Sequence, residues 1–450
     1  MKKKKLAFLL SALMLMSALT GCGGKTTETT ADTPGEEKVL KIAAFEGGYG
    51  KVHWEKMKEK FEAANEGVTV ELQIASNIEE VIRPQIQAGN IPDLVYLATG
   101  RPDALTETFI KEQSLSDLSG VLEKTVPGED VKVKDKILPG FLDTKATNPY
   151  SDGKTYLAPL FYGPTGLFYN KALIKEKGYE LPKTWDEMFA LGDTAKAEGI
   201  SLFSYATTGY LDCLIPPVLA AAGGVEAVDK AMNYEEGFWN SAEATKTLDT
   251  IGKIKDYLEP TVVANANKQG FKNNQQLILD NKALFIPNGT WLPDEMKDAP
   301  RAEGFEWGFM AYPSFDKDGD NYSVNFFEQM YIPKEASNKE LAEEFMAYMY
   351  SDEAAAIIAE NAKGVIPVTG AIDIAKEYLE PLQIDMLSIY DNGSLPLMTG
   401  FAATTPVEGV NFTDVYVGTV DSIMSGAKTV EEWQKSLQEA SDKLRAAIIK

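Results

Sequence analysis

Histidine and cysteine are nearly missing from this sequence. Of its 450 residues, one is histidine, His53, and two are cysteines, Cys22 and Cys213. Nucleophilic triads and most transition-metal sites need more imidazole or thiolate than this, so we expect no catalytic triad, metal centre or cofactor. His53 stands at the start of a predicted helix, where we expect it to be exposed or to cap the helix.

The two cysteines do not predict a disulfide. Cys22 lies in a processing motif described below, which leaves Cys213 as the only other thiol. Exported proteins often carry disulfides, so this chain must be stable on its hydrophobic core alone. We expect Cys213 to be a small buried hydrophobic residue.

Positive charge is also scarce. The chain has 44 Lys and Arg against 67 Asp and Glu, a formal net charge of −23. This balance argues against nucleic acid as a partner and against attachment to anionic lipid by charge. It predicts nothing about the charge of a ligand, because net charge acts mostly on solubility.

The acidic stretch Asp316–Asp320 resembles a calcium-binding loop in composition but lacks the ligand spacing of an EF-hand. An EF-hand loop needs glycine at its sixth position and glutamate at its twelfth, and here these positions hold Asn321 and Phe327. We therefore predict a hairpin turn here.

Hydrophobic runs are short, and the longest one is N-terminal. Leu6–Leu19 has 14 residues and follows the positive region Lys2–Lys5. That length is short for a membrane-spanning helix and typical of a secretory signal. Leu19-Thr20-Gly21-Cys22 resembles the lipobox of bacterial lipoproteins, which implies removal of residues 1–21 and acylation of Cys22. A plain signal peptide with a chance cysteine is the alternative.

The segment after Cys22 predicts a flexible tether. Gly23–Glu37 is rich in Gly, Thr and Glu and has no aliphatic residue except Ala31. It cannot bury a core, so we assign residues 22–38 to the acylated cysteine and tether. A chain of 450 residues is too long to fold around one hydrophobic core, so we expect two lobes after the tether.

The first part of the folded region alternates strand and helix patterns. We predict strands at 39–45, 68–74 and 94–97, with helices between them at 54–61 and 78–88. This order implies a parallel sheet covered by helices, hence an α/β fold. Ligands of such sheets bind at the carboxyl ends of strands. Here those ends are Glu46–Gly50 and Thr99–Arg101.

Asp152–Asn170 is the stretch around which the chain is organised. Its sequence, DGKTYLAPLFYGPTGLFYN, predicts a short strand at Thr155–Leu157 and an aromatic run at Leu167–Tyr169. The two prolines and two glycines between them predict an interruption of regular structure and a crossing between two bodies. An ordinary interior strand with a kink is the alternative.

Beyond this crossing, the same patterns predict further elements. The last predicted helix opens with a capping box, Thr429 with Glu432. The others are helices at 171–178, 184–198, 241–256, 275–281 and one carrying Leu341, Phe345 and Met349, and strands at 201–205, 283–286 and 307–312.

Aromatic and polar residues placed after strand ends and near the crossing are the candidate ligand-binding residues. Aromatic rings stack on the C–H faces of sugars, and Asp, Glu, Asn, Gln and Arg pair with sugar hydroxyls. Taken alone, an aromatic side chain at such a position is more often a core residue than a ligand platform, and Trp291 is the exception because of the motif around it. The candidates are Tyr49, Tyr162, Tyr205, Tyr210, Trp291 and Phe326, with Glu46, Arg101, Asp212, Asn288, Glu328 and Gln329.

Several motifs, taken in order, resemble one family. From about Val39 onwards the chain resembles the family 1 extracellular solute-binding proteins of ABC importers, the class that includes maltose-binding proteins. The resemblance is carried by the lipobox, Asp152–Tyr156 with Pro159, Leu167–Lys171, Pro182–Glu187, Asn288–Trp291 and Ser337–Ala342. One departure is Phe-Ile-Pro at 285–287, where many members have Ala-Met.

The resemblance implies a fold and a ligand site. It implies two α/β lobes, each a mostly parallel sheet flanked by helices, joined by hinge strands with the ligand between them. In that picture residues 39–160 and 313–350 form lobe 1, and residues 161–312 and 351–450 form lobe 2. The hinges would lie at Phe161–Pro164, near Tyr312 and near Met349–Asp352. Trp291 and one or more tyrosines would stack on a sugar ring, while Glu46, Asp212 and Glu328 would orient hydroxyls.

The resemblance also implies partners and location. The chain would be a monomer anchored by lipid on the extracellular face of the membrane, and it would deliver a carbohydrate to ABC transporter subunits. Phe45–Gly50 and Val81–Asp93 are similar to members that bind N-acetylglucosamine or chitobiose. An exported carbohydrate-active enzyme using two carboxylates is the alternative, as is a sensor that presents its ligand to a receptor.

Overall fold

The computed structural model describes residues 38–448 except 100, 102, 143 and 403. The predicted signal peptide, the lipidation site Cys22 and the tether up to residue 37 lie outside the described residues.

One sheet runs through the described part of the chain. Its strands follow the order β2-β1-β3-β8-β4-β6-β5, with β7 paired to β4 and β9 paired to β8. The strands are β1 (Lys38–Phe45), β2 (Val68–Ala75), β3 (Leu94–Tyr96), β4 (Ala158–Asn170), β5 (Ser201–Phe203), β6 (Ala283–Gly289), β7 (Trp307–Met310), β8 (Tyr322–Tyr331) and β9 (Leu395–Leu397).

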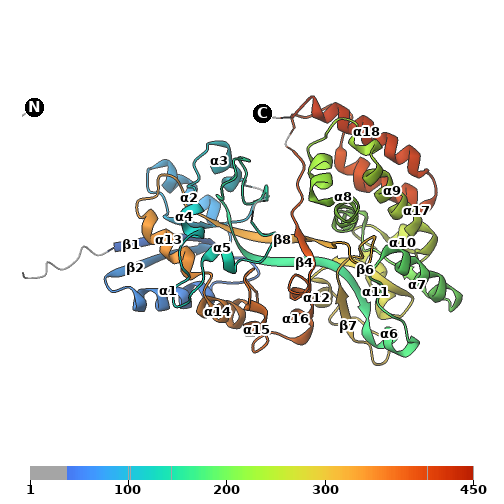
Figure 1. Cartoon of the computed structure of the whole chain (residues 1–450), viewed down its shortest axis with the longest axis horizontal. Helices are drawn as coiled ribbons and strands as arrows, with labels where there is room; N and C mark the ends of the chain where they lie inside the picture. The colour runs from blue at the N-terminus through green and yellow to red at the C-terminus, as the bar shows by residue number, and fades with distance from the viewer. Residues whose placement is uncertain (1–37, 100, 102, 143, 403, 449–450) are drawn as a thin grey trace, which may run out of the picture. The chain divides into compact units, whose positions relative to one another are not determined.

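Helices surround both ends of this sheet. In Figure 1, α1, α2 and α13 gather around β1 and β2, while α7 and α11 lie beside β6, and α9 lies farther out with α8 and α18. The α-helices are α1 (Val52–Ala64), α2 (Ile78–Gln87), α3 (Leu105–Lys111), α4 (Ser119–Leu122), α5 (Val133–Lys136), α6 (Lys171–Lys177), α7 (Trp185–Ala197), α8 (Ile215–Met232), α9 (Ala242–Ile254), α10 (Val262–Asn265), α11 (Phe271–Leu279), α12 (Leu292–Glu295), α13 (Lys339–Tyr348), α14 (Asp352–Ala362), α15 (Ala371–Ala375), α16 (Pro381–Leu387), α17 (Thr419–Ser425) and α18 (Val430–Arg445). Short 3-10 helices are η1 (Thr208–Cys213), η2 (Phe238–Asn240) and η3 (Lys255–Tyr257), and η4 (Asp414–Gly418) is a π-helix.

The parallel start of the sheet is confirmed. Strand β1 pairs in parallel with both β2 and β3, and α1 buries Trp54, Met57 and Phe61 against them. The expectation for His53 was wrong, because this side chain is fully buried. His53 lies one turn before Met57 and so on the apolar stripe of α1. Burial lowers the pKa of His53 to about 4, which leaves the imidazole neutral.

The strand β4 is longer and more regular than the sequence indicated. It runs unbroken through Pro159, Gly163, Pro164 and Gly166, while Thr155–Leu157 precedes it outside any strand. The predicted interruption and the predicted short strand were therefore wrong. A register shift between Pro159 and Phe161 absorbs the irregularity, as β-bulges do.

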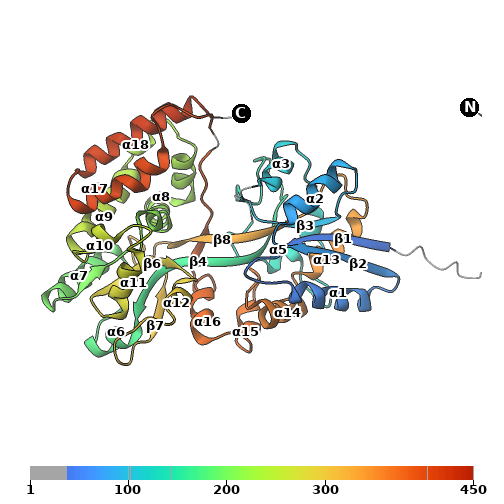
Figure 2. The same ribbon diagram turned by 180° about the vertical axis from the view of Figure 1, so that it is seen from behind.

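Strands β4 and β8 connect the two ends of the sheet. They pair antiparallel from Ala158 with Met330 to Pro164 with Asn325, and Figure 2 shows them side by side from behind as well. Farther along, β4 pairs with β6 and β7. A Cβ added at Gly166 would lie 2.6 Å from the carbonyl oxygen of Met310, so the close approach of β7 requires glycine there.

The turn at Asp316–Asp320 is confirmed, but it does not close a hairpin. The N–H of Gly319 donates to the carbonyl of Asp316 at 2.9 Å. The strands on either side, β7 and β8, each pair with a different stretch of β4. The chain thus returns along β4 through Tyr322–Tyr331.

Buried tryptophans and caps fix the helices. Trp54, Trp185, Trp239 and Trp433 are among the largest fully buried side chains, and each anchors a different helix. The capping box of α18 is present: Thr429 accepts from the N–H of Glu432, and the Glu432 side chain accepts from the N–H of Thr429.

Among the residues that the structure describes, one helical segment, 208–232, is long and apolar enough to cross a bilayer by length and composition. Most of it is buried in the fold, where α8 packs against α9. Gly223 and Gly224 leave helical geometry and kink it.

The helix α14 packs against α1, and Lys60 on α1 forms an ion pair with Glu353 at 3.1 Å. This contact joins α1, expected in lobe 1 from the sequence, to α14, expected in lobe 2. The lobe boundaries themselves stay a prediction.

Candidate functional site

Three aromatic side chains from different elements meet beyond the end of β6. The indole Nε1–H of Trp291 donates to the hydroxyl of Tyr210 at 3.1 Å. The Trp291 ring lies 6.3 Å from the Tyr210 ring and 5.5 Å from the Phe326 ring, centroid to centroid. We call these three residues the aromatic cluster.

The Asn-Gly-Thr-Trp motif explains the position of Trp291. A Cβ added at Gly289 would lie 2.1 Å from the Trp291 ring, so the indole folds back over the glycine. Phe326 is 53% exposed, although it is a large apolar side chain on a strand otherwise largely buried. An exposed aromatic ring beside Trp291 is typical of a surface that contacts a ligand.

A cavity of about 360 Å³ lies next to the aromatic cluster and shares Phe326 with it. Its walls come from η1, α8, β8 and the C-terminal segments. The residues that line it are Gly209, Asp212, Cys213, Pro216, Met232, Val324, Phe326, Thr399, Gly400, Phe401, Thr413 and Tyr416. We call it the Asp212 cavity.

A second, larger cavity of about 720 Å³ shares Met232, Thr399, Gly400 and Phe401 with the first. It reaches Thr99 after β3 and Ala146, at the β1 end of the sheet. The two cavities together therefore extend from the β6 end of the sheet toward the carboxyl end of β3, where a parallel sheet usually binds its ligand.

Asp212 is the charged residue of the smaller cavity. It is half-buried on η1, and within the described part of the chain it has no hydrogen bond or ion pair. Burial raises the pKa of its carboxyl to about 6.

Glu328 and Tyr49 meet at a different place, around Phe161. The Tyr49 ring stacks on the Phe161 ring at 4.0 Å, and His53 approaches the same ring edge-on at 5.5 Å. Glu328 pairs with Phe161 across β8 and β4. Its Oε2 is buried and has no partner among the described residues.

Burial raises the pKa of both ionisable groups at this place. It raises the pKa of Glu328 to about 7. Burial, and then the charge of Glu328, also raise the pKa of the Tyr49 hydroxyl. Glu328 is thus a carboxyl that the fold favours in its neutral form.

Other predicted ligand residues are held by structural partners. Arg101 forms an ion pair with Glu79 at 2.8 Å and lies 3.8 Å above the Phe45 ring. The Gln329 side chain accepts from the N–H of Thr99 and donates to the carbonyl of Ala146. These contacts position the loop after β3.

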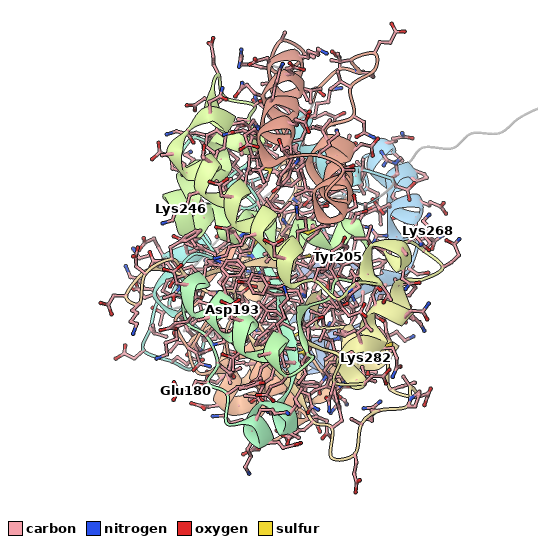
Figure 3. All side chains as sticks on the ribbon, turned by 90° about the vertical axis from the view of Figure 1, so that its right-hand side faces the viewer. Glu180, Asp193, Tyr205, Lys246, Lys268 and Lys282 are labelled. Carbon is pink, nitrogen blue, oxygen red and sulfur yellow. The ribbon has the colours of Figure 1, made fainter. Side chains whose placement is uncertain are left out.

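Two of the tyrosines lie in the core. Tyr162 is buried against Phe141 and Tyr390 and donates its hydroxyl to the carbonyl of Leu387 at 3.1 Å. Tyr205 is buried after β5, whereas Glu180 and Lys246, which are labelled near the edge of the molecule in Figure 3, are exposed.

The remaining two candidates lie at strand ends. Asn288 is fully buried and accepts from the N–H of Gly289, while its own Nδ2 has no partner among the described residues. Glu46 is half-buried in the loop after β1, and its backbone N–H donates to Ala75.

Sequence reasoning missed part of the cavity wall. Met232, Thr399, Phe401, Thr413 and Tyr416 line it but follow no predicted strand. The segments that contain them lack a regular spacing of apolar residues, so the sequence did not indicate their positions. The tertiary fold brings them beside Asp212. Among the described residues, no group of three or more His, Cys, Asp or Glu side chains could hold a metal ion.

The arrangement combines aromatic faces, hydroxyls and one carboxylate around a cavity, which suits a ligand with both C–H faces and polar groups.

Comparison with known proteins gives the family. Residues 56–380 match the family model of the bacterial extracellular solute-binding proteins, so the chain belongs to that family. The α/β fold class and the resemblance inferred from sequence are thereby confirmed.

Individual relatives are sugar-binding proteins by name. The chain is 27% identical to the diacetylchitobiose binding protein NgcE of Streptomyces coelicolor, over 77% of this chain and 75% of that protein. It is 24% identical to the multiple sugar-binding protein of Streptococcus mutans, over 73% and 74% of the two chains. These relatives are binding proteins by name, and the family is described as extracellular.

A solved structure shares the fold. The solute receptor AcbH, described as having an exclusive preference for β-D-galactopyranose, superposes with a TM-score of 0.67 at 16% identity. The match covers 91% of this chain and all of that chain.

Proposed function

We propose that this chain is an extracellular binding protein that captures a sugar or oligosaccharide and delivers it to an ABC transporter. The observation that carries the proposal is the aromatic cluster of Trp291, Tyr210 and Phe326 beside the cavity that Asp212 lines. Rings of this kind stack on sugar faces, and the carboxylate accepts hydrogen bonds from hydroxyls. The names of the relatives support a carbohydrate ligand.

The ligand-binding set that we propose is smaller than the set expected from sequence. It keeps Trp291, Tyr210, Phe326, Asp212 and Glu46. Glu328, Tyr49 and Asn288 are weaker candidates because burial limits their access to a ligand: Glu328 is half-buried within β8, Tyr49 is half-buried in the loop after β1, and Asn288 is fully buried on β6. We leave out four other residues, because contacts within the protein or burial in the core make their side chains unavailable to a ligand: Arg101, Tyr162, Tyr205 and Gln329.

We propose two lobes that close on the ligand about β4 and β8, as hinge-closing binding proteins do. Because α14 packs on α1, α15 packs on α14 and Val368 bridges to Ile137, we assign residues 352–375 to the first lobe and the later helices to the second. Residues up to 160 belong to the first lobe, and 161–312 belong to the second.

The experiment that tests the function is a calorimetric titration with monosaccharides and oligosaccharides, including N-acetylglucosamine and N,N′-diacetylchitobiose. A binding protein gives saturable heat, and chromatography afterwards recovers the sugar intact. Cleaved sugar would instead support a carbohydrate-active enzyme, which no feature of the site favours. Flat titrations across the panel would contradict carbohydrate binding.

We also propose that Cys22 is acylated and anchors the chain to the outer face of the membrane as a monomer. The support is the lipobox pattern Leu19–Cys22. Expression of the full chain and of Cys22→Ser, followed by membrane fractionation and mass spectrometry, tests it. The wild-type chain should fractionate with membranes and carry lipid on Cys22, and the variant should be released. Membrane retention of the variant would contradict the anchor.

A further inference from the structure

Asp212 is an isolated negative charge in its cavity. Of the twelve residues that line the Asp212 cavity, it alone is charged; the others are apolar residues, glycines, a cysteine, two threonines and a tyrosine. No basic side chain forms an ion pair with it in the described part of the chain.

The neighbouring cavity does not supply a basic side chain that could pair with Asp212. Its charged lining residues are Lys145 and Asp229. These two pair with each other, with 3.5 Å between Nζ and Oδ1. Among the described residues that line the two cavities, Asp212 is therefore the one charged side chain without a partner of opposite charge.

The environment of Asp212 favours a cation over a neutral group. Burial alone already disfavours the ionised carboxyl. A neutral ligand that displaced the remaining water would add to this cost, whereas a protonated amine would form a charge-assisted hydrogen bond.

Aromatic rings border the same space. Phe326 lines the cavity and belongs to the aromatic cluster, and Phe401 and Tyr416 contact each other edge-on at 5.6 Å in its wall. The faces of aromatic rings attract cations, as in the aromatic cages that hold quaternary ammonium groups, and a carboxylate adds a charge-assisted hydrogen bond to a protonated amine.

We propose that Asp212 selects a saccharide that carries a protonated amine, such as a 2-amino-2-deoxy sugar with an unacetylated nitrogen, over its neutral N-acetylated counterpart. This inference rests on the proposed sugar-binding function and names the chemical class of its ligand. The amine lies against the Asp212 carboxylate, and the rest of the sugar lies against the aromatic cluster.

The test is isothermal titration of the mature chain with two matched disaccharides, β-1,4-linked di-glucosamine and N,N′-diacetylchitobiose, at a pH where the amine is protonated. Wild-type protein should bind the amine form about tenfold or more tightly than the acetylated form. Asp212→Asn, which keeps the shape of the side chain, should abolish this difference. Asp256→Asn, an exposed position on η3, is the matched control and should retain it.

The outcomes separate the inference from the function. If wild-type protein binds the acetylated sugar as tightly as the amine form, or if Asp212→Asn keeps the preference, the inference is overturned and sugar binding stands. If no sugar of the calorimetric panel binds but choline or spermidine binds in an Asp212-dependent way, amine recognition stands and the sugar-binding function is overturned. If other sugars of the panel bind but neither disaccharide does, the inference is overturned and sugar binding stands. Absence of binding to the whole panel, choline and spermidine overturns both. Circular dichroism and thermal melting confirm that each variant is folded.

Discussion

The Nε1–H of Trp291 donates to the hydroxyl of Tyr210 at 3.1 Å, across 81 positions of sequence. This bond joins the end of β6 to η1, the short helix that also carries Asp212. It orients the indole ring beside the exposed ring of Phe326 and so sets the geometry of the proposed site.

Replacing Trp291 should weaken ligand binding. Trp291→Ala removes the stacking surface and the donor to Tyr210, and we expect a loss of about 1–3 kcal/mol in binding free energy for the saccharide identified by calorimetry. Trp291→Phe keeps a ring but not the N–H, so its loss should be smaller. Affinities equal to wild type in both variants would remove Trp291 from the site.

Phe326 should matter for binding and little for stability. Its ring is 53% exposed, so Phe326→Ala should change the free energy of unfolding by less than about 1 kcal/mol. The same variant should weaken saccharide binding, because the ring borders both the cavity and Trp291. Phe285→Ala, a fully buried comparison on β6, should destabilise by about 3–5 kcal/mol. A large stability loss in Phe326→Ala with unchanged affinity would refute this role.

Glu328 should make stability depend on pH. Burial raises its pKa from 4.5 to about 7, so the folded state binds a proton more tightly than the unfolded state. The stabilisation is full below pH 4.5 and is lost as the pH rises through 7. Between pH 5 and pH 8, wild-type protein should therefore lose about 1–3 kcal/mol more unfolding free energy than Glu328→Gln does.

Urea unfolding at the two pH values measures this difference. Glu66→Gln, an exposed position, serves as the control and should follow the wild type. Parallel pH dependence of wild type and Glu328→Gln would show that Glu328 titrates normally.

Gly166 should tolerate no side chain. A Cβ there would lie 2.6 Å from the carbonyl oxygen of Met310, a backbone atom that cannot turn away. We expect Gly166→Ala to destabilise the fold by about 2 kcal/mol or more, since strands β4 and β7 would have to separate. Gly120→Ala, with open space around the new Cβ, should be neutral or slightly stabilising. Equal melting temperatures for the two variants would disprove the close approach.

The sequence predicted the elements whose apolar residues keep a regular period. Strands β1 and β2 and helix α1 fall close to their expected limits because alternation and the Trp54–Met57–Phe61 stripe are local signals. The Thr429–Glu432 capping box is equally local, and it marks the start of α18 correctly.

Tertiary pairing overrode local signals elsewhere. The prolines and glycines of 159–166 predicted a break, yet pairing with β8, β6 and β7 keeps β4 extended throughout. Strand β8, with Phe326 and Glu328, was not predicted as a strand at all. His53 was misplaced because a single polar residue on an apolar stripe gives no sign of its burial.

The candidate site was predictable only in part. Trp291, Tyr210 and Asp212 follow recognisable motifs or turns, and the structure brings Trp291 and Tyr210 into contact. Tyr416 lies on η4 and Thr413 directly precedes it, far along the chain, and long-range packing alone places them in the cavity wall.

The central claim is that the aromatic cluster beside Asp212 binds a saccharide, and tryptophan fluorescence tests it most directly. The mature chain is titrated with the sugar panel while intrinsic emission is followed, with Trp291→Phe as the control for the reporting residue. We predict a saturable change in wild-type emission, its loss or marked reduction in Trp291→Phe, and recovery of unchanged sugar. An identical saturable change in the variant would show that the ligand binds away from Trp291, and no change with any sugar would contradict the saccharide site itself.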